Sequence, residues 1–366
     1  MTDDKLPDFE VIANERPRSA DERAELLAEP GFGSVFTDHM FTMRWSADRG
    51  WHSARVEPFG PLTLSPATAV LHYAQEIFEG LKAYHRSDGT VGLFRPEANA
   101  QRFNGSARRL AMPELPEKWF LASIRELISV DRDWVPTEGE SSLYVRPFMI
   151  ATESFLGVRP SQEYLYGVIT SPAGAYFKTG PKPVTLWVSE DYTRAAPGGT
   201  GAAKCGGNYA ASLAPHSQAI EKGCDQVVFL DAVEHKYIDE LGGMNLFFVY
   251  GDEKVIYTPR LTGSILPGIT RDAIITLLSE EGWDVHETDY SLEKWRADAQ
   301  SGRLTETFAC GTAAVITPVG MIREQGGEFS INESKTGELT RRLRSRILDI
   351  QHGRAEDTHN WTQTIE

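Results

Sequence analysis

Apolar and polar positions in the first half of the chain alternate in patterns that predict both helices and strands. We expect a helix from about Pro66, followed by a hairpin whose turn is Ser87-Asp88-Gly89. Two further helices are expected in RPEANAQRFNGSARRL, where Pro96 suits the first helical position, and in PEKWFLASIRELISV. The runs SSLYVRPFMIATE and EYLYGVITSPAG then indicate strands.

The second half mixes the same two kinds of element. PVTLWVSE, QVVFLDA, KYIDELGGMNLFFVY and KVIYTP are strand-like, whereas GITRDAIITLLSEEG and GELTRRLRSRILDIQHG have helical spacing of apolar residues. The intervening GAYFKTGPKP is rich in Gly, Pro and Lys and predicts a linker at 174–182. We therefore expect an α+β protein with a smaller N-terminal domain (1–173), a larger C-terminal domain (183–366) and a cleft between them.

Composition narrows the classes of partner. The 366 residues carry a net charge of −15, which argues against nucleic acid or anionic membrane as the main partner. The three cysteines form no C-x-x-C pair, and MTDDKLPDFE lacks the layout of a signal peptide, so a cytoplasmic location is expected. No apolar run approaches the ~20 residues of a membrane helix.

One lysine has unusual surroundings. In GGTGAAKCGGNYAAS, Lys204 lies among small residues, and no other Lys, Arg, Asp or Glu occurs from Ala195 to Ile220. A P-loop is excluded because Ala203 precedes this lysine and Cys205 follows it. The chain contains no G-x-S-x-G elbow, and its nine histidines show no ligand spacing, so no metal site is expected.

An amine in a desolvated setting suits attack on a carbonyl group, because the neutral form is then favoured. Small neighbours also leave room for a flat ring. Both features indicate a Schiff base, most often with pyridoxal phosphate. The alternative is an ordinary lysine in a glycine-rich loop.

Such a cofactor needs a carboxylate at its ring nitrogen, and N–H groups and a cation at its phosphate. Glu240 lies between apolar segments, although it could be a turn glutamate before Gly242-Gly243. The sequence LPGIT could aim helix amides at an anion, or could be a plain helix entry. A charge inside the apolar run LYVRPF is normally paired or functional, which singles out Arg146.

Eight stretches together resemble the branched-chain amino acid aminotransferases, which are fold-type IV pyridoxal-phosphate enzymes. In chain order they are FTDHM, LHYAQEIFEGLKAY, LYVRP, GAYF, KCGGNY, DELGGMN, LPGITR and GTAAVITP. The resemblance implies a two-domain D-amino acid aminotransferase-like fold with pyridoxal 5′-phosphate in the cleft. It also implies a homodimer that moves amino groups between L-leucine, L-isoleucine or L-valine and 2-oxoglutarate by a ping-pong route.

The resemblance also implies roles for individual residues. Lys204 forms the covalent link and is the catalytic residue. The other cofactor-binding residues are Arg102, Tyr209, Glu240, Ile269, Thr270 and Thr312. The substrate-binding residues are Tyr73, Phe78, Tyr144, Arg146, Leu156, Val158, Tyr176 and Ala313, part of them supplied by the neighbouring subunit.

Two departures and two rival functions accompany this resemblance. GTAAVITP lacks the redox cysteines of some eukaryotic relatives, and Gly243 stands where those relatives have a threonine. A D-amino acid aminotransferase or aminodeoxychorismate lyase would keep the Lys and Glu but not YVRP with EGLKAY. A non-catalytic phosphate- or nucleotide-binding module would bind no pyridoxal phosphate.

Overall fold

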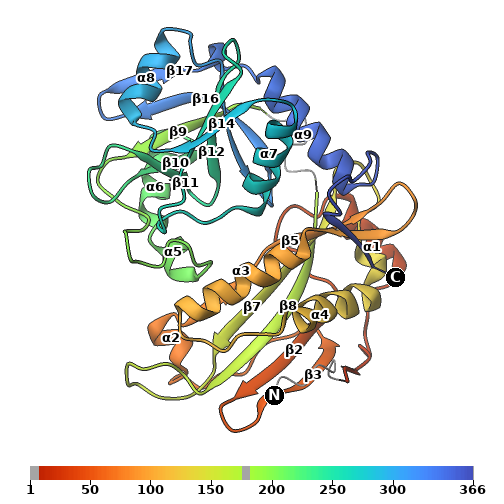
Figure 1. Ribbon diagram of the computed structural model, residues 1–366. Coiled ribbons are helices and arrows are strands. Elements are labelled where there is room, and N and C mark those ends of the chain that lie inside the picture. Colours follow the sequence, from red (N-terminus) through yellow and green to blue (C-terminus); the bar gives the residue numbers. More distant parts are fainter. Residues whose placement is uncertain (1–7, 175–181, 366) are drawn as a thin grey trace. The chain divides into compact units, whose positions relative to one another are not determined.

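The computed structural model describes residues 8–174 and 182–365, and the described chain divides into two compact units (Figure 1). Unit 1 contains the residues up to 174, the short segment Ala203–Gly206 and the residues from Asp349 onward. Unit 2 contains residues 182–202 and Gly207–Leu348.

Unit 1 is built on a largely antiparallel sheet. The strand order is β1-β3-β2-β8-β7-β5-β6-β18, with β4 paired to β7 and one parallel pair, β1–β3. Its strands are β1 (Glu10–Val11), β2 (His39–Ser46), β3 (Gly50–Pro58), β4 (Glu76–Phe78), β5 (Leu81–His85), β6 (Val91–Phe94), β7 (Ser142–Ala151), β8 (Glu163–Ala173) and β18 (Thr362–Ile365). Its helices are α1 (Ala20–Ala28), α2 (Ala69–Tyr73), α3 (Pro96–Arg109), α4 (Glu117–Val130) and the 3-10 turn η1 (Arg132–Trp134).

Strand β7 separates the core of unit 1 from the residues of chemical interest. Leu143, Val145 and Met149 are fully buried in the core cluster that also contains apolar residues of α3 and α4. Successive side chains of a strand point to opposite faces. Tyr144 and Arg146 therefore share the other face of this strand.

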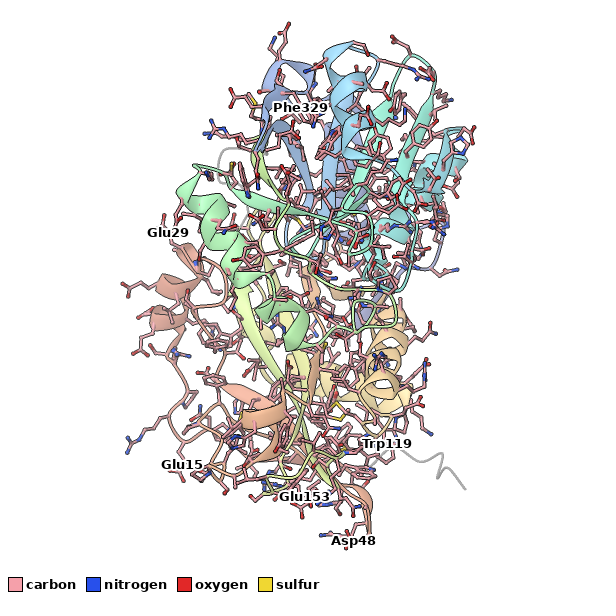
Figure 2. All side chains as sticks on the ribbon, turned by 90° about the vertical axis from the view of Figure 1, so that its left-hand side faces the viewer. Glu15, Glu29, Asp48, Trp119, Glu153 and Phe329 are labelled. Atoms are coloured by element: carbon pink, nitrogen blue, oxygen red, sulfur yellow. The ribbon has the colours of Figure 1, made fainter. Side chains whose placement is uncertain are left out.

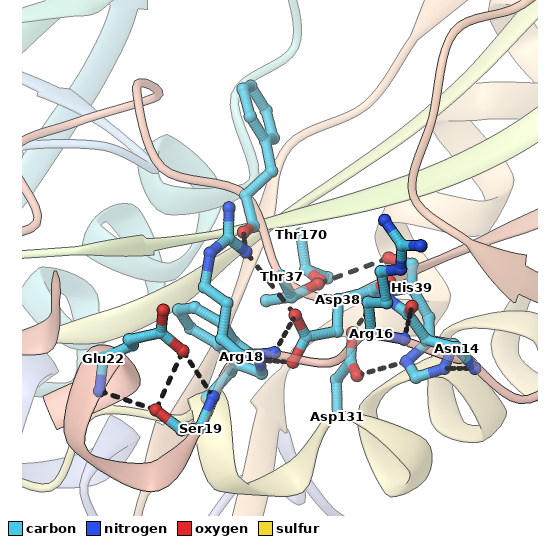
Figure 3. A network of polar contacts seen from close by, with 12 residues as sticks. Asn14, Arg16, Arg18, Ser19, Glu22, Thr37, Asp38, His39, Asp131 and Thr170 are labelled. Carbon is cyan, nitrogen blue, oxygen red and sulfur yellow. Dashed lines mark hydrogen bonds and ion pairs between the residues drawn. The ribbon is translucent and has the colours of Figure 1, made fainter.

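A buried polar network ties the chain before α1 to this sheet (Figure 3). Nδ1 of His39 lies 2.7 Å from Oδ1 of Asp131, and the backbone N–H of Asn14 donates to Nε2 of His39 at 3.2 Å. The backbone N–H of Arg18 donates to Asp38 at 3.2 Å. Because Nε2 accepts, Nδ1 carries the proton that is donated to Asp131. Two residues of the FTDHM stretch thus have a structural role.

Unit 2 is built on a mixed sheet. Its strand order is β11-β10-β9-β16-β15-β12-β13-β14, with β17 paired to β16, and the pairs β9–β10, β9–β16 and β13–β14 are parallel. Its strands are β9 (Val184–Ser189), β10 (Gln226–Leu230), β11 (Ile238–Leu241), β12 (Asn245–Tyr250), β13 (Val255–Pro259), β14 (Asp284–Thr288), β15 (Glu306–Gly311), β16 (Val315–Glu324) and β17 (Gly327–Ser330). The helical elements of the second half are α5 (Gly206–Ala210), α6 (Leu213–Glu221), α7 (Ile269–Glu280), α8 (Leu292–Gln300), η2 (Asn332–Ser334) and α9 (Glu338–Gln351).

The core of unit 2 is rich in aromatic residues. Every residue of β12 is buried, as its nearly continuous apolar sequence requires of a strand covered on both faces. Phe248 of β12 stacks on Tyr290 at 3.8 Å between ring centroids. Trp295 of α8 meets Phe329 of β17, which Figure 2 labels, edge-on at 5.8 Å. These contacts pack β12, α8 and β17 into one core in unit 2.

The expected α+β class is confirmed, and most predicted elements are present. The helix expected from about Pro66 is the short α2, and the separate strand β4 precedes the predicted hairpin of β5 and β6. The sequence placed Lys204 in the C-terminal domain, whereas the segment Ala203–Gly206 packs with unit 1. The expected linker at 174–182 lies almost wholly outside the described residues, so the domain boundaries 1–173 and 183–366 stay a prediction.

Candidate active site

The backbone around Lys204 is held by unit 1 on both sides. The N–H of Lys204 donates to Oγ of Ser106 at 2.8 Å, and its carbonyl accepts from the N–H of Phe78 at 3.0 Å. The N–H of Gly206 donates to the carboxylate of Glu76. None of these bonds uses the Lys204 side chain, so the backbone positions the amine.

The Lys204 amine has an altered proton affinity. The residue as a whole is half-buried, but protein groups surround its amine, and Nζ lies 4.8 Å from the ring centroid of Phe78. Desolvation, followed by the charge of Arg102, lowers the pKa of Lys204 to about 8. The desolvated setting expected from the sequence is present, with Phe78 and charged residues as close neighbours.

Arg102 of α3 pairs with a carboxylate that the sequence analysis missed. Its Nε and Nη2 donate to the two oxygens of Glu79 at 2.7 and 2.9 Å. Glu79 has no exposed surface, and the Arg102 side chain is 10% exposed. In the sequence, Glu79 is the glutamate of IFEGLKAY. It was missed because a glutamate before a glycine resembles an ordinary turn residue.

Arg146 lies among aromatic rings on the outer face of β7. Its Nη2 donates to the hydroxyl of Tyr144 at 3.1 Å, and its Cζ lies 4.6 Å from the ring centroid of Phe78. Its Nε is buried and has no hydrogen-bond partner within the described residues. A buried donor of this kind suits an anionic ligand. Gly80 leaves space for Tyr144, since a Cβ at Gly80 would come within 2.1 Å of that hydroxyl.

Three further predicted pocket residues lie on the surface of unit 1. Tyr73 is 37% exposed, Leu156 67% and Val158 88%, and the Tyr73 hydroxyl donates to the carbonyl of Leu156. Tyr176 lies outside the described residues. Leu156 and Val158 therefore bury little of their surface against their own chain.

Glu240 is buried in strand β11 of unit 2 and is not a turn residue. Its Oε1 lies 2.5 Å from Nη1 of Arg194 and accepts the N–H of Leu266 at 3.2 Å. Arg194 also donates to the carbonyl of Ser264 at 3.0 Å. Sequence reasoning missed Arg194, which lies in a loop far from Glu240 along the chain.

The other predicted groups of unit 2 lie at element ends. Ile269 and Thr270 begin α7 after the N-cap Gly268, where a Cβ would come within 2.0 Å of Oδ1 of Asn245. Thr312 and Ala313 form the turn between β15 and β16. The first N–H groups of a helix suit a phosphate, because no acceptor within the helix uses them.

Tyr209 of α5 lies beside the turn that follows Glu240. A Cβ at Gly243 would be 3.5 Å from the Tyr209 ring and 3.7 Å from its hydroxyl. Gly243, which departs from the pattern of some eukaryotic relatives, is therefore next to the tyrosine expected at the cofactor. Tyr209 and the turn after β11 therefore lie close together in unit 2.

Metal and membrane alternatives gain no support from the part of the chain that the structure describes. No group of three or more His, Cys, Asp or Glu side chains there could hold a metal ion. None of the helices there has the length and hydrophobicity needed to cross a bilayer. The three cysteines, Cys205, Cys224 and Cys310, are buried and free.

Comparisons with known proteins agree with this chemistry. Residues 76–322 match the family model "Amino-transferase class IV". The branched-chain-amino-acid aminotransferase of Mycolicibacterium smegmatis is 56% identical over 97% of each chain. A crystal structure of the Escherichia coli branched-chain amino acid aminotransferase covers 90% of this chain and 99% of its own, with a TM-score of 0.74 and 30% identity.

Another solved structure contains a ligand. The branched-chain amino acid aminotransferase of T.th., solved with N-(5′-phosphopyridoxyl)-L-glutamate, is 28% identical with a TM-score of 0.72. It covers 88% of this chain and 98% of its own.

Proposed function

Since the chain belongs to the class IV aminotransferases, and among them to the branched-chain amino acid aminotransferases, we propose that it exchanges amino groups between L-leucine, L-isoleucine or L-valine and 2-oxoglutarate. The observation that carries this function is 56% identity to an enzyme of that name over nearly the whole of both chains. The half-buried Lys204, with its pKa of about 8, supports the same chemistry.

Each unit, taken by itself, carries groups of the kinds that pyridoxal 5′-phosphate needs. Lys204 supplies an amine for the covalent link, and Glu240 a buried carboxylate for the ring nitrogen, with Tyr209 at the ring hydroxyl. The proposed phosphate donors are Arg102, Ile269, Thr270 and Thr312. When bound, the cofactor supplies an electron sink for the charge left when a substrate loses its α-proton.

Lys204 has the proton affinity that acid–base work at the substrate requires. With a pKa of about 8, its amine can take the α-proton near neutral pH and return it later. A pKa close to the working pH serves both directions of transfer, because neither protonation state is then strongly favoured. Phe78 restricts access of water to one side of this amine.

The substrate carboxylates meet Tyr144, Arg146 and the N–H of Ala313 in this proposal. The aromatic rings of Phe78 and Tyr144 flank the Arg146 guanidinium. An apolar wall beside the half-buried Arg146 can accept a leucine side chain and also the second carboxylate of 2-oxoglutarate. This combination suits an enzyme with two dissimilar substrates.

A homodimer is part of the same proposal. Leu156 and Val158 are apolar and highly exposed, and the family resemblance implies that part of the pocket wall comes from the neighbouring subunit. Tyr73 would join them. A cytoplasmic location also stays a proposal.

Turnover tests the function. Purified protein supplied with pyridoxal phosphate should convert L-leucine and 2-oxoglutarate to the 2-oxo acid and L-glutamate. D-alanine should give no product. Turnover of D-alanine but not L-leucine would favour a D-amino acid aminotransferase, and no absorbance from a bound cofactor would favour a non-catalytic module.

Arg102→Ala should weaken cofactor binding more than leucine binding. It also leaves Glu79 buried without its cation, which costs about 3–5 kcal/mol of stability. Titration of the cofactor-free protein with pyridoxal phosphate, at a temperature where both proteins are folded, measures the first effect. Unchanged cofactor affinity with a raised KM for leucine would assign Arg102 to the substrate.

Arg146→Ala should impair the reaction of 2-oxoglutarate more than that of leucine. A hydrogen bond to a charged group contributes about 1.5–3 kcal/mol, which corresponds to a loss of roughly ten- to a hundredfold. Stopped-flow measurement of each half-reaction separates the two substrates. Equal losses would mean that Arg146 is structural or binds the carboxylate that both substrates share.

A further inference from the structure

Glu79 is fully buried, and its carboxylate accepts four hydrogen bonds. Nε and Nη2 of Arg102 donate at 2.7 and 2.9 Å, Nδ2 of Asn99 donates at 2.7 Å, and the N–H of Gly80 donates at 3.1 Å. The carboxylate is therefore held in one orientation. No role in the proposed reaction has been assigned to this residue.

Helix α3 brings the donors together. Asn99 and Arg102 are three residues apart and share one face of the helix. Ser106 lies one turn further, and its hydroxyl accepts the N–H of Lys204 at 2.8 Å. One helical face thus carries the partners of Glu79 and the anchor of Lys204.

Glu79 remains charged in these surroundings. Burial alone would favour the protonated form. The ion pair with Arg102, the nearby Lys204 and the bond from Asn99 outweigh burial, so the pKa of Glu79 lies below its ordinary value. Glu79 therefore supplies a fixed negative charge at neutral pH.

Lys204 faces charges of both signs. Desolvation acts most strongly on its pKa, and Arg102 and Arg146 lower it further, whereas Glu79 and Tyr144 raise it. Without Glu79, the desolvation and the two guanidinium groups would face little opposition. The pKa of the amine would then be lower than in the parent protein.

We propose that Glu79 is a positioning residue of the lysine site: its carboxylate holds the Arg102 guanidinium in one orientation and balances the cations Arg102, Arg146 and Lys204. The pairing uses two of the five N–H donors of Arg102, on its Nε–Nη2 edge, and so sets the direction of the others. The inference rests on the proposed role of Lys204. Glu79 would keep the Lys204 amine able to hold a proton as well as to release one.

The test measures the proton affinity of the Lys204 amine in cofactor-free protein. Pyridoxal lacks the phosphate, so its Schiff base forms without the proposed phosphate contact of Arg102. The rate of its formation is followed by absorbance between pH 6 and 10. For the parent protein it should rise with pH, with a midpoint at about 8, because the neutral amine attacks.

Glu79→Gln should lower this midpoint by at least about one unit. At pH 6.5 the rate, as a fraction of its high-pH plateau, is then about eightfold above that of the parent. Glu79→Asp keeps the charge and should restore most of the midpoint. A midpoint that does not move in Glu79→Gln would overturn the proposal even if the variant melts earlier, because a merely structural role changes stability alone.

Glu253→Gln is the matched control. Glu253 forms a similar two-bond pair with Arg303, at 2.6 and 3.0 Å, on the surface of unit 2. The same substitution there should leave the midpoint unchanged. A shift equal to that of Glu79→Gln would mean that any lost carboxylate suffices, which contradicts the proposal.

A second comparison applies if Glu79→Gln does not fold. The double variant Glu79→Gln/Arg102→Met removes both members of the buried ion pair, and its midpoint should lie below that of Arg102→Met alone. Equal midpoints would overturn the proposal. Borohydride reduction and peptide mapping distinguish failure of the Lys204 assignment from failure of the Glu79 proposal. Label at another lysine refutes the role of Lys204. An unmoved midpoint with label at Lys204 refutes only the role of Glu79.

Discussion

Lys204→Ala should lower kcat by about 10³-fold or more while leaving the fold intact. The amine is the proposed acid–base group, and such a group contributes about 10²–10⁴-fold by itself. The covalent link to the cofactor is lost as well. The measurement is turnover of L-leucine with 2-oxoglutarate at saturating pyridoxal phosphate.

Stability should be unchanged or slightly higher in this variant. The hydrogen bonds of the Lys204 backbone to Ser106 and Phe78 do not need the side chain. A lowered pKa also means that the surroundings penalise the charged amine. Thermal melting of the cofactor-free proteins checks this, and a large drop in melting temperature would show that the lost activity reflects unfolding.

Lys222→Ala is the control for removing a lysine. Lys222 follows α6 and contacts the ring of Trp187, with its Nζ 5.2 Å from the ring centroid. The Lys222→Ala variant should keep the parent activity. Parent-like activity in Lys204→Ala, by contrast, would eliminate this residue as the catalytic lysine.

Glu240→Gln should leave the cofactor bound and slow the proton-transfer step by about 10–100-fold. Gln keeps the shape but cannot hold a proton on the ring nitrogen, and loss of a charged hydrogen bond corresponds to about 1.5–3 kcal/mol. The electron sink is then weaker when Lys204 removes the α-proton. Pre-steady-state rates with L-leucine and α-deuterated L-leucine should show both the slower step and a larger isotope effect.

Asp239 is a demanding control because it precedes Glu240 in the same strand. Successive strand residues point to opposite faces, and Asp239 accepts a hydrogen bond from Ser264 at 3.1 Å. Burial raises the pKa of Asp239 to about 6. Asp239→Asn should keep the proton-transfer rate. If Glu240→Gln has the parent rate and Asp239→Asn is slow, Asp239 and not Glu240 is the carboxylate at the ring nitrogen.

Elements with strong local signals were predicted well. Pro96 does begin α3, and the turn at Ser87-Asp88-Gly89 does join β5 and β6. The helix expected from about Pro66 ends at Tyr73, because the next residues enter β4, which pairs with β7. Long-range pairing of that kind leaves little trace in local periodicity.

The charged partners of the candidate site were harder to predict. Lys204 was found because its neighbours are small, and Arg146 because it interrupts an apolar run. Glu79 and Arg194 pair with arginine or glutamate residues 23 and 46 positions away, respectively. Such pairs depend on which elements pack together, so no spacing in the sequence marks them.

The most direct test of the central claim is to locate the lysine that binds the cofactor. The protein is loaded with pyridoxal phosphate and reduced with borohydride, and the labelled peptide is identified by mass spectrometry. One labelled peptide is expected, with the phosphopyridoxyl group on Lys204, and no label is expected when L-leucine without 2-oxoglutarate is added before reduction. Label on any other lysine, with Lys204 unmodified, would contradict the assignment of Lys204 as the cofactor-binding residue.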